Sequence, residues 1–176
     1  MSNHQDSKDD WEVVAGELVA VNSAHDIGKG KVNQIMVRLV EGIGIEGDFH
    51  AGKKRHRQLS LLGVERIRSF VDQGLIAEPG SLGENLTVQG FDLESLPLGA
   101  RVTIGEGPSA VVLDISHRGK FCSSAMKALG TDDKTILEID RIYAGVIKGG
   151  DIEAGQKIRV EIPPEGQQVS VFQKKV

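Results

Sequence analysis

Glycine occurs at 22 of the 176 positions, about one residue in eight, whereas globular proteins average roughly 7% glycine. Because glycine adopts backbone conformations that other residues avoid, this frequency predicts many tight turns. Turns at short intervals suit a protein built of short strands better than one built of long helices. The sequence therefore favours a mainly β fold.

Short β-rich runs between these glycines agree with that expectation. The runs are Val13–Val21, Ile35–Val40, Gln58–Leu62, Asn85–Val88, Arg101–Ile104, Ala110–Ser116, Tyr143–Ile147 and Lys157–Ile162. Several short strands separated by turns are typical of a β-barrel or a β-sandwich. From the residues alone, both architectures remain open.

One segment in the first half of the chain has the pattern of a helix instead. Within Val64–Gln73, the residues Val64, Ile67 and Val71 recur at helical spacing and would share one face. Gly74 follows directly and can serve as the C′ residue that ends the helix. We expect a helix of about three turns here, next to the third predicted strand.

A second, shorter helix is expected immediately after the single cysteine. Ser123 or Ser124 can cap its N-terminus, and Gly130 can end it. Cys122 would then lie between a predicted strand and the start of a helix. The expected fold is a β core with a few short helices.

Composition and charge limit the class of protein. Hydrophobic residues make up 39% of the chain and charged residues 26%, which indicates a compact globular protein. The formal net charge is −4 with both signs interspersed, so nucleic acid is not an expected partner. The polar start, MSNHQDSKDD, and the lack of any run of 18 apolar residues disfavour export and membrane spanning, which leaves the cytoplasm as the expected location.

The sequence also indicates a single domain. Residues 1–10 are expected to be a disordered tail, residues 11–165 one domain, and residues 166–176 a C-terminal tail that wraps the surface or frays. One cysteine forms no internal disulfide and cannot build a multi-cysteine zinc or iron–sulfur site within one chain. The oligomeric state is left open.

Cys122 is a candidate nucleophile or metal ligand. A helix N-terminus favours an anion, and Arg118 and Lys120 lie close in sequence, so we expect a lowered thiol pKa and more thiolate. The thiolate is the form that attacks sulfur or binds a metal. The alternative is an inert cysteine that fills apolar space.

A basic loop is the second candidate. Residues 50–57 contain six cationic or titratable side chains between two predicted strands: His50, Lys53, Lys54, Arg55, His56 and Arg57. Such a loop can neutralise a phosphate or another oxyanion, and arginine gives bidentate contacts. The alternative is a solvated charged loop in which His50 is a structural histidine.

The third candidate is PGSLGENLTVQG at residues 79–90. Its glycines permit a tight backbone path, after which Glu84 and Asn85 would project from the start of a strand and orient a ligand or the basic loop. The alternative is a hairpin turn in which Asn85 caps its own backbone. The segment matches neither the dinucleotide-binding nor the Walker glycine pattern.

Taken in order, these segments resemble the MOSC domain family, which is named for the C-terminal domain of molybdenum cofactor sulfurases. The resemblance spans roughly residues 14–162. It rests on GIEGDFH at 44–50, RQLSLL at 57–62, GSLGENLTVQG at 80–90, VTIG at 102–105, Cys122 and YAGVIKGGDIEAG at 143–155. Two departures stand out: Phe121 where the family often has proline, and Gly155-Gln156 where it has Gly-Asp.

The resemblance implies a mainly β fold, a β-barrel of the MOSC or pyruvate kinase type with a few short helices. It also implies that Cys122 carries sulfur as a persulfide or ligates molybdenum. The cofactor-binding positions that match the family are His50, Arg57, Gln58, Glu84 and Asn85, to which the neighbouring Arg55 and Arg118 are added. The expected cofactor is the molybdenum cofactor (molybdopterin), whose phosphate suits a basic loop and whose metal–sulfur centre suits a thiolate.

Several functions remain open under this resemblance. The chain shows no pyridoxal phosphate site of its own, so a sulfur donor such as a cysteine desulfurase and a molybdoenzyme or cofactor acceptor are the expected partners. One alternative is a small molybdenum-dependent reductase of N-hydroxylated compounds, and another is a non-catalytic cofactor-binding or adaptor module. If the site is shared, His50, Arg57, Asn85 and Cys122 should line one pocket.

Overall fold

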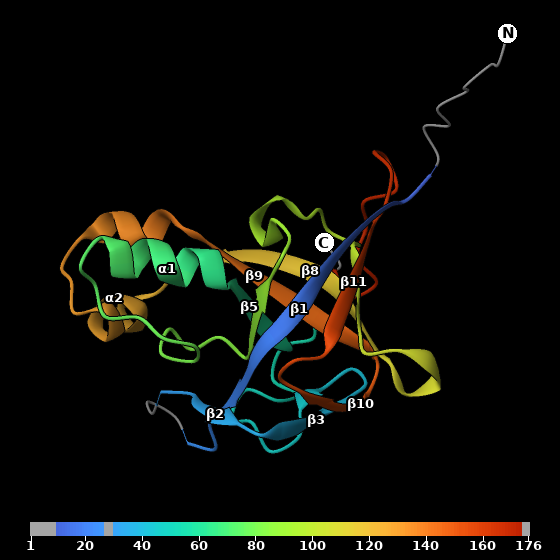
Figure 1. Ribbon diagram of the computed structural model, residues 1–176, viewed down its shortest axis with the longest axis horizontal. Coiled ribbons are helices and arrows are strands. Elements are labelled where there is room, and N and C mark those ends of the chain that lie inside the picture. Colours follow the sequence, from blue (N-terminus) through green and yellow to red (C-terminus); the bar gives the residue numbers. More distant parts are fainter. Residues whose placement is uncertain (1–9, 27–29, 174–176) are drawn as a thin grey trace, which may run out of the picture.

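Seven strands close into a barrel in the described part of the chain, residues 10–26 and 30–173 of the computed structural model (Figure 1). In spatial order they are β1 (Glu12–Ser23), β11 (Lys157–Ile162), β7 (Arg101–Ile104), β8 (Val111–Lys120), β9 (Asp140–Lys148), β5 (Leu59–Gly63) and β6 (Leu86–Gln89). β6 pairs again with β1, and all neighbours are antiparallel except β5 and β6. The predicted mainly β barrel is confirmed, and its closure excludes the sandwich alternative.

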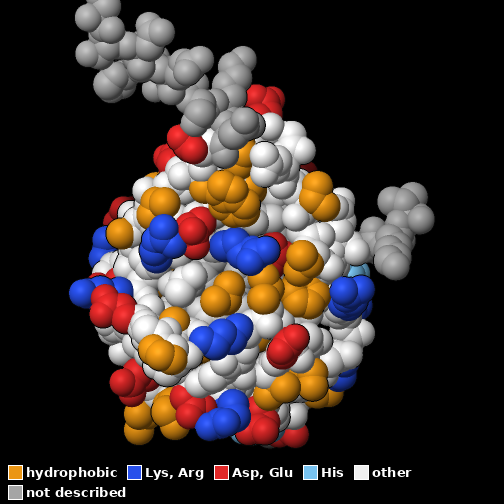
Figure 2. Space-filling view, turned by 90° about the vertical axis from the view of Figure 1, so that its right-hand side faces the viewer, with side chains coloured by type: hydrophobic (Ala, Val, Ile, Leu, Met, Phe, Trp, Pro, Cys, Tyr) orange, Lys and Arg blue, Asp and Glu red, His pale blue; other side chains and the backbone are white. Residues whose placement is uncertain are grey.

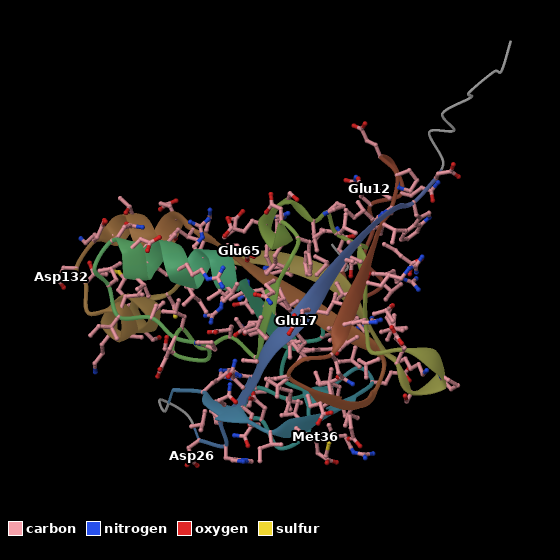
Figure 3. All side chains as sticks on the ribbon, viewed as in Figure 1. Glu12, Glu17, Asp26, Met36, Glu65 and Asp132 are labelled. Atoms are coloured by element: carbon pink, nitrogen blue, oxygen red, sulfur yellow. The ribbon has the colours of Figure 1, made fainter. Side chains whose placement is uncertain are left out.

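Four short strands complete the β structure of the described residues, and one of them matches a predicted run, Ile35–Val40. β2 (Val32–Gln34) pairs with the end of β1, while β10 (Gly150–Glu153), β3 (Met36–Val40) and β4 (Gly44–Ile45) form a small separate sheet. Both lie below the barrel in Figure 1, and Figure 3 shows Met36 on β3 there. Short 3-10 turns occupy the remaining connections, at η1 (Leu93–Ser95), η2 (Gly107–Ser109) and η3 (Lys134–Glu138).

The barrel core consists of the inward-facing residues of these strands. Leu18, Leu61, Leu86, Leu113 and Val146 are at most 1% exposed, and each buried side chain of this size stabilises the fold by about 1.5–3 kcal/mol. Buried and more exposed positions alternate along β11, whereas β5 is buried at four consecutive positions. This rigid core holds the loops at the barrel ends in fixed positions.

The first helix, α1 (Val64–Asp72), lies at one end of the barrel, on the left in Figure 1. Glu65 stands in its first turn, where a negative charge is favoured (Figure 3), and Gly74 follows its end with φ of 80°. Its buried residues are Ile67 and Phe70, whereas Val71 is 50% exposed. The predicted apolar face was therefore wrong at Val71, because Phe70 and not Val71 packs against the protein.

The second helix, α2 (Ser123–Leu129), packs against the same apolar cluster as α1. Neither serine caps it: Cys122 itself holds the N-cap position, which corrects the predicted cap. Gly130 ends the helix in the left-handed conformation, as expected. No helix in the described residues is long and apolar enough to cross a membrane.

Residues beyond β11 return to the barrel and pack on it. Ser170 and Phe172 are buried, and the Ser170 hydroxyl and the Val171 amide both donate to the carboxylate of Asp114 on β8. Burial raises the pKa of Asp114 above its ordinary value, although the hydrogen bonds from Ser170 and Val171 oppose the shift. The predicted C-terminal tail therefore includes a docked segment. The predicted N-terminal tail lies outside the described residues except for Asp10.

Candidate functional site

A cavity of about 310 Å³ brings the predicted site residues together. Five of the residues that line it are cationic and, in the described part of the chain, none is a carboxylate. The lining consists of Lys31, His50, Lys53, Lys54, Arg57, Gln58, Ser60, Gly83, Asn85, Cys122, Arg141 and Tyr143. His50, Arg57, Asn85 and Cys122 thus share one cavity, as expected from the sequence. On the face of the molecule shown in Figure 2, by contrast, side chains of both charges are mixed.

Cys122 is exposed, and its Sγ lies 3.1 Å from Oγ of Ser124. Desolvation raises the pKa of the thiol, but hydrogen bonds from the Ser124 hydroxyl and from the Ala125 and Ser124 amides outweigh this effect, and the charge of Arg141 adds to them. The pKa therefore lies below its ordinary value. The direction agrees with the sequence-based expectation, but the cation responsible is Arg141.

Arg118 and Lys120, the cations expected to act on Cys122, lie elsewhere. Arg118 donates to the Leu96 carbonyl at 2.5 Å and lies 3.6 Å from Asp140, and Lys120 pairs with Asp140 at 2.8 Å. Successive side chains of a strand point to opposite faces, and His117 on β8 faces the cavity residue Arg57. Arg118 therefore points away from the cavity, and this placement does not support its predicted contact with the cofactor.

Arg57 is half-buried at the wall of the cavity. Its Nη2 donates to Nε2 of His117 at 2.8 Å, and its Cζ lies 5.2 Å from the ring centroid of Tyr143. Because a guanidinium accepts no hydrogen bond, the His117 nitrogen is the acceptor. The Nε of Arg57 is buried without a partner in the described structure. An unsatisfied buried donor costs about 1–3 kcal/mol, so a ligand that accepts from it would be stabilised.

Arg55, by contrast, does not line the cavity. Its guanidinium donates to the Val171 carbonyl at 3.2 Å, and its Cζ lies 5.7 Å from the ring centroid of Phe172. It therefore contacts the segment beyond β11. The prediction that Arg55 contacts the cofactor is not supported by this placement.

Asp48 organises one side of the cavity. It is 7% exposed and accepts hydrogen bonds from Nζ of Lys31 at 2.8 Å and from the amides of Ala24 at 3.1 Å and His50 at 2.9 Å. Burial alone would raise the pKa of Asp48, but the hydrogen bonds from Lys31 and His50 outweigh it and lower the pKa. Asp48 thus fixes Lys31 and the start of the basic loop.

Asn85 has its hydrogen-bonding groups occupied by protein. Its Oδ1 accepts from the amide of Ser60 at 3.1 Å, and its Nδ2 donates to the carbonyl of Asn22 at 3.2 Å and to Asp48 at 3.3 Å. It therefore ties β5 to the end of β1 beside the cavity. Its placement supports the predicted role of orienting neighbouring groups.

Gln58 is similarly committed to the protein. Its Oε1 accepts from the Val146 amide at 2.9 Å, and its Nε2 donates to the Arg55 carbonyl at 2.8 Å. The side chain is 3% exposed, so it bridges β9 and the basic loop from inside the protein. Gln58 therefore lines the cavity, but both polar atoms of its side chain are bonded to protein and hold the basic loop in place.

Glu84 is 1% exposed and does not line the cavity. Its Oε1 accepts from the Gly80 amide at 2.6 Å and from the Thr87 hydroxyl at 3.0 Å, while Oε2 has no partner in the described structure. Burial raises the pKa of this carboxyl, against the opposing hydrogen bonds from Gly80 and Thr87. Glu84 stabilises the glycine turn, so its predicted contact with the cofactor is not supported.

Arg141 and Lys31 also line the cavity, although no sequence motif predicted them. Arg141 on β9 is 9% exposed, donates to the Leu82 carbonyl at 2.5 Å and lies with its Cζ 5.3 Å from the ring centroid of Phe121. A Cβ on Gly83 would come within 3.2 Å of its Nη2, so glycine leaves room for it. Arg141 lies two residues before the predicted run Tyr143–Ile147, so the available signal was an arginine next to a β-rich segment that in fact begins at Asp140.

The chemistry of this cavity follows from its groups. A thiol with a lowered pKa opens onto a space whose charged walls are all cationic, which suits an anion with a soft or electrophilic end. No group of three or more His, Cys, Asp or Glu among the described residues could hold a metal ion. A larger hollow of about 520 Å³ beside α1 contains the Arg66–Glu94 ion pair, and its described lining includes no thiol.

Comparison with known proteins agrees with this fold. No curated protein matches the chain. Among solved structures, the YuaD protein of Bacillus subtilis is similar with a TM-score of 0.71 and 21% identity, over 86% of this chain and 98% of that protein. YiiM of Geobacillus stearothermophilus is similar with a TM-score of 0.64 and 18% identity, over 89% of this chain and 80% of that protein. At these identities the likeness shows the fold.

YiiM of Escherichia coli also has this fold, with a TM-score of 0.54 and 20% identity over 93% of this chain and 74% of that protein. The sequence model of the MOSC domain matches residues 46–159, which contain the basic loop, Asn85, Cys122 and Arg141. That match covers well over half of the chain. The protein therefore belongs to the MOSC domain family, which is associated with the molybdenum cofactor.

Proposed function

We propose that this protein binds the molybdenum cofactor in the 310 Å³ cavity and uses Cys122 to carry sulfur to it. The observation that carries the proposal is the presence of one thiol of lowered pKa in a cavity with five cations and, in the described part of the chain, no carboxylate. A cavity of one charge sign selects anionic ligands. The thiol adds a group that reacts with sulfur.

The donor groups of the cavity fit the two ends of this cofactor. Its phosphate suits Arg57, whose Nε is buried without a partner in the described structure, together with Lys53 and Lys54. Its metal–sulfur end suits the thiolate of Cys122, because soft ligands and soft centres associate. When bound, the cofactor would supply the molybdenum centre and its sulfur ligands.

The protein's own step is the loading of Cys122 with sulfur. The thiolate of Cys122 attacks the terminal sulfur of a persulfide on a donor such as a cysteine desulfurase. A sulfur–sulfur bond forms at Cys122, the donor's sulfur–sulfur bond breaks, and the donor leaves as a thiolate. Cys122 then holds a persulfide beside the cationic wall, where Arg141 stabilises its negative charge until a cofactor or molybdoenzyme accepts the sulfur.

A two-part experiment tests the proposal. Cofactor released from a molybdoenzyme is titrated against the wild type, Arg57→Ala and the control Arg38→Ala, whose exposed arginine pairs with Asp151; neither residue of that pair lines the cavity. We expect saturable binding that Arg57→Ala weakens and Arg38→Ala leaves unchanged. Incubation with a persulfide donor should add the mass of one sulfur atom to the wild type and none to Cys122→Ser.

Other outcomes would favour other functions. Retention of molybdenum together with turnover of an N-hydroxylated compound and an electron donor would favour the reductase. Failure to retain cofactor, with a Cys122 that accepts no sulfur, would leave only a non-catalytic module. Retention of cofactor without sulfur loading would make Cys122 a direct contact of the bound cofactor.

A further inference from the structure

Residues 170–172, here called the strap, are bound to the barrel by buried contacts. Ser170 is 4% exposed and Phe172 8% exposed. The Ser170 hydroxyl and the Val171 amide donate to the buried carboxylate of Asp114, and the Phe172 amide donates to Oγ of Ser170 at 3.1 Å. These contacts fix the strap against β8.

The barrel has glycines where the strap and the residue before it come closest. A Cβ on Gly145 of β9 would lie 2.2 Å from the ring of Phe172. A Cβ on Gly99 would lie 2.6 Å from the Val169 carbonyl, and Gly99 also has φ of 84°. A side chain at either position would displace residues 169–172, so glycine at both positions leaves room for this segment. Gly145 belongs to the YAGVIKGG segment but does not line the cavity, and its contact with Phe172 explains why it is glycine.

The strap also contacts the basic loop that forms part of the cavity wall. Arg55 donates to the Val171 carbonyl at 3.2 Å, and its Cζ lies 5.7 Å from the ring centroid of Phe172. The carbonyl of Arg55 accepts from buried Gln58 at 2.8 Å. Two residues on, Arg57 lines the cavity. The loop is thus held from the strap side by Arg55 and from the barrel side by Gln58.

We propose that the strap sets the position of the basic loop through Arg55, so that Arg55 and Phe172 are positioning residues for the anion-binding cavity. A charged hydrogen bond and a cation–π contact restrict a loop whose other side chains are largely exposed. Loss of either contact leaves Lys53, Lys54 and Arg57 present but less well oriented. The effect on ligand binding rests on the proposed function, whereas the effect on the loop does not.

Hydrogen exchange and a double-mutant cycle in the full chain test this proposal. The variants are Phe172→Ala, Arg55→Gln and their combination, and Val169→Ala is the control because that side chain is 63% exposed in the same segment. Arg55→Gln leaves the buried contacts of the strap intact, so it remains informative if Phe172→Ala folds poorly. Amide exchange is followed in residues 51–57 and, as an internal reference, in α1.

We expect each single variant to speed exchange in residues 51–57 by about tenfold, while α1 and the control are unchanged. The double variant should exchange no faster than the faster single variant, since Arg55 makes both the hydrogen bond and the ring contact and its loss already removes both. Binding of cofactor released from a molybdoenzyme should weaken in parallel, by about fivefold or more.

Unchanged amide exchange in residues 51–57 of Arg55→Gln would overturn the proposal. It would also be overturned if the rate increase in the double variant equalled the product of the two single increases. A wild type that binds no cofactor, while loop exchange still responds to both variants, would refute the proposed function and support the strap. If Arg55→Gln and Phe172→Ala bind cofactor as tightly as the wild type does, the positioning role is overturned.

Discussion

Replacing Asp48 by alanine tests the buried ion pair beside the cavity. The side chains of Lys31 and Asp48 are 6% and 3% exposed, with Nζ and Oδ2 2.8 Å apart. Removal of the carboxylate leaves Lys31 buried without its partner and frees the amides of Ala24 and His50. Breaking a buried pair from one side typically costs about 3–5 kcal/mol, because the remaining charge is uncompensated.

The matched control is Asp151→Ala, which breaks the Arg38–Asp151 pair at 2.7 Å. Those side chains are 58% and 38% exposed, so water screens the pair and its loss should cost about 0.2–1 kcal/mol. The free energy of unfolding is measured by urea titration followed by circular dichroism. We also expect Lys31→Met to restore much of the stability of Asp48→Ala, since the uncompensated charge is then gone.

The pH dependence gives an independent check. In the wild type, desolvation lowers the pKa of Lys31 and Asp48 opposes that shift, so removing Asp48 should lower the pKa further. The unfolded chain then binds more protons than the folded one between this pKa and the unfolded value of about 10.4. The stability of Asp48→Ala relative to wild type should therefore recover as pH rises through that window. Equal losses for Asp48→Ala and Asp151→Ala, or no recovery with pH or with Lys31→Met, would refute the reasoning.

Three further predictions concern the cavity directly. The rate of Cys122 alkylation should have its midpoint below the free-cysteine value of about 8.5, and a midpoint at or above that value would contradict the lowered pKa. Arg57→Ala should weaken cofactor binding by about 1.5–3 kcal/mol and Lys53→Ala, which removes an exposed charge, by under about 1, so equal losses in titration would argue against the assignment. Gly83→Ala should lower the free energy of unfolding by about 1–2 kcal/mol, because Gly83 has φ of 83° and its Cβ would crowd Arg141; an unchanged urea midpoint would show that the turn adapts.

Hydrophobic patterning predicted the barrel strands but not their ends. β8 extends four residues past the predicted Ser116, through the polar sequence His117–Lys120, because its backbone stays paired with β9 as far as Asp140. The short strands β2, β4 and β10 have two to four residues, too few for alternation to be visible. Pairing with a distant partner defines these elements, and a single sequence does not contain that information.

The candidate site could be predicted where its residues are neighbours in sequence. The motifs around His50, Arg57, Asn85 and Cys122 each stood out locally, and their glycine turns marked the loops at the barrel end. Arg141 could not be found in this way, because its importance arises from the pairing of β9 with β8 and β5, which places it beside the cavity. Sequence proximity was also misleading for Arg118, since strand alternation directs it to the opposite face from His117.

The residues of the family motifs fall into two groups: buried side chains that are hydrogen-bonded to the protein, and exposed side chains at the cavity. Asp48, Gln58, Glu84 and Asn85 are at most 7% exposed and bond mainly to the protein, so substitutions there should reduce stability together with ligand binding. Cys122, by contrast, is exposed at the cavity, where its thiol is available for chemistry. A buried group already committed to the protein cannot also serve a ligand without losing those bonds. Most of the motif therefore specifies the shape of the cavity, and a small number of cations with one thiol remain to act on what enters it.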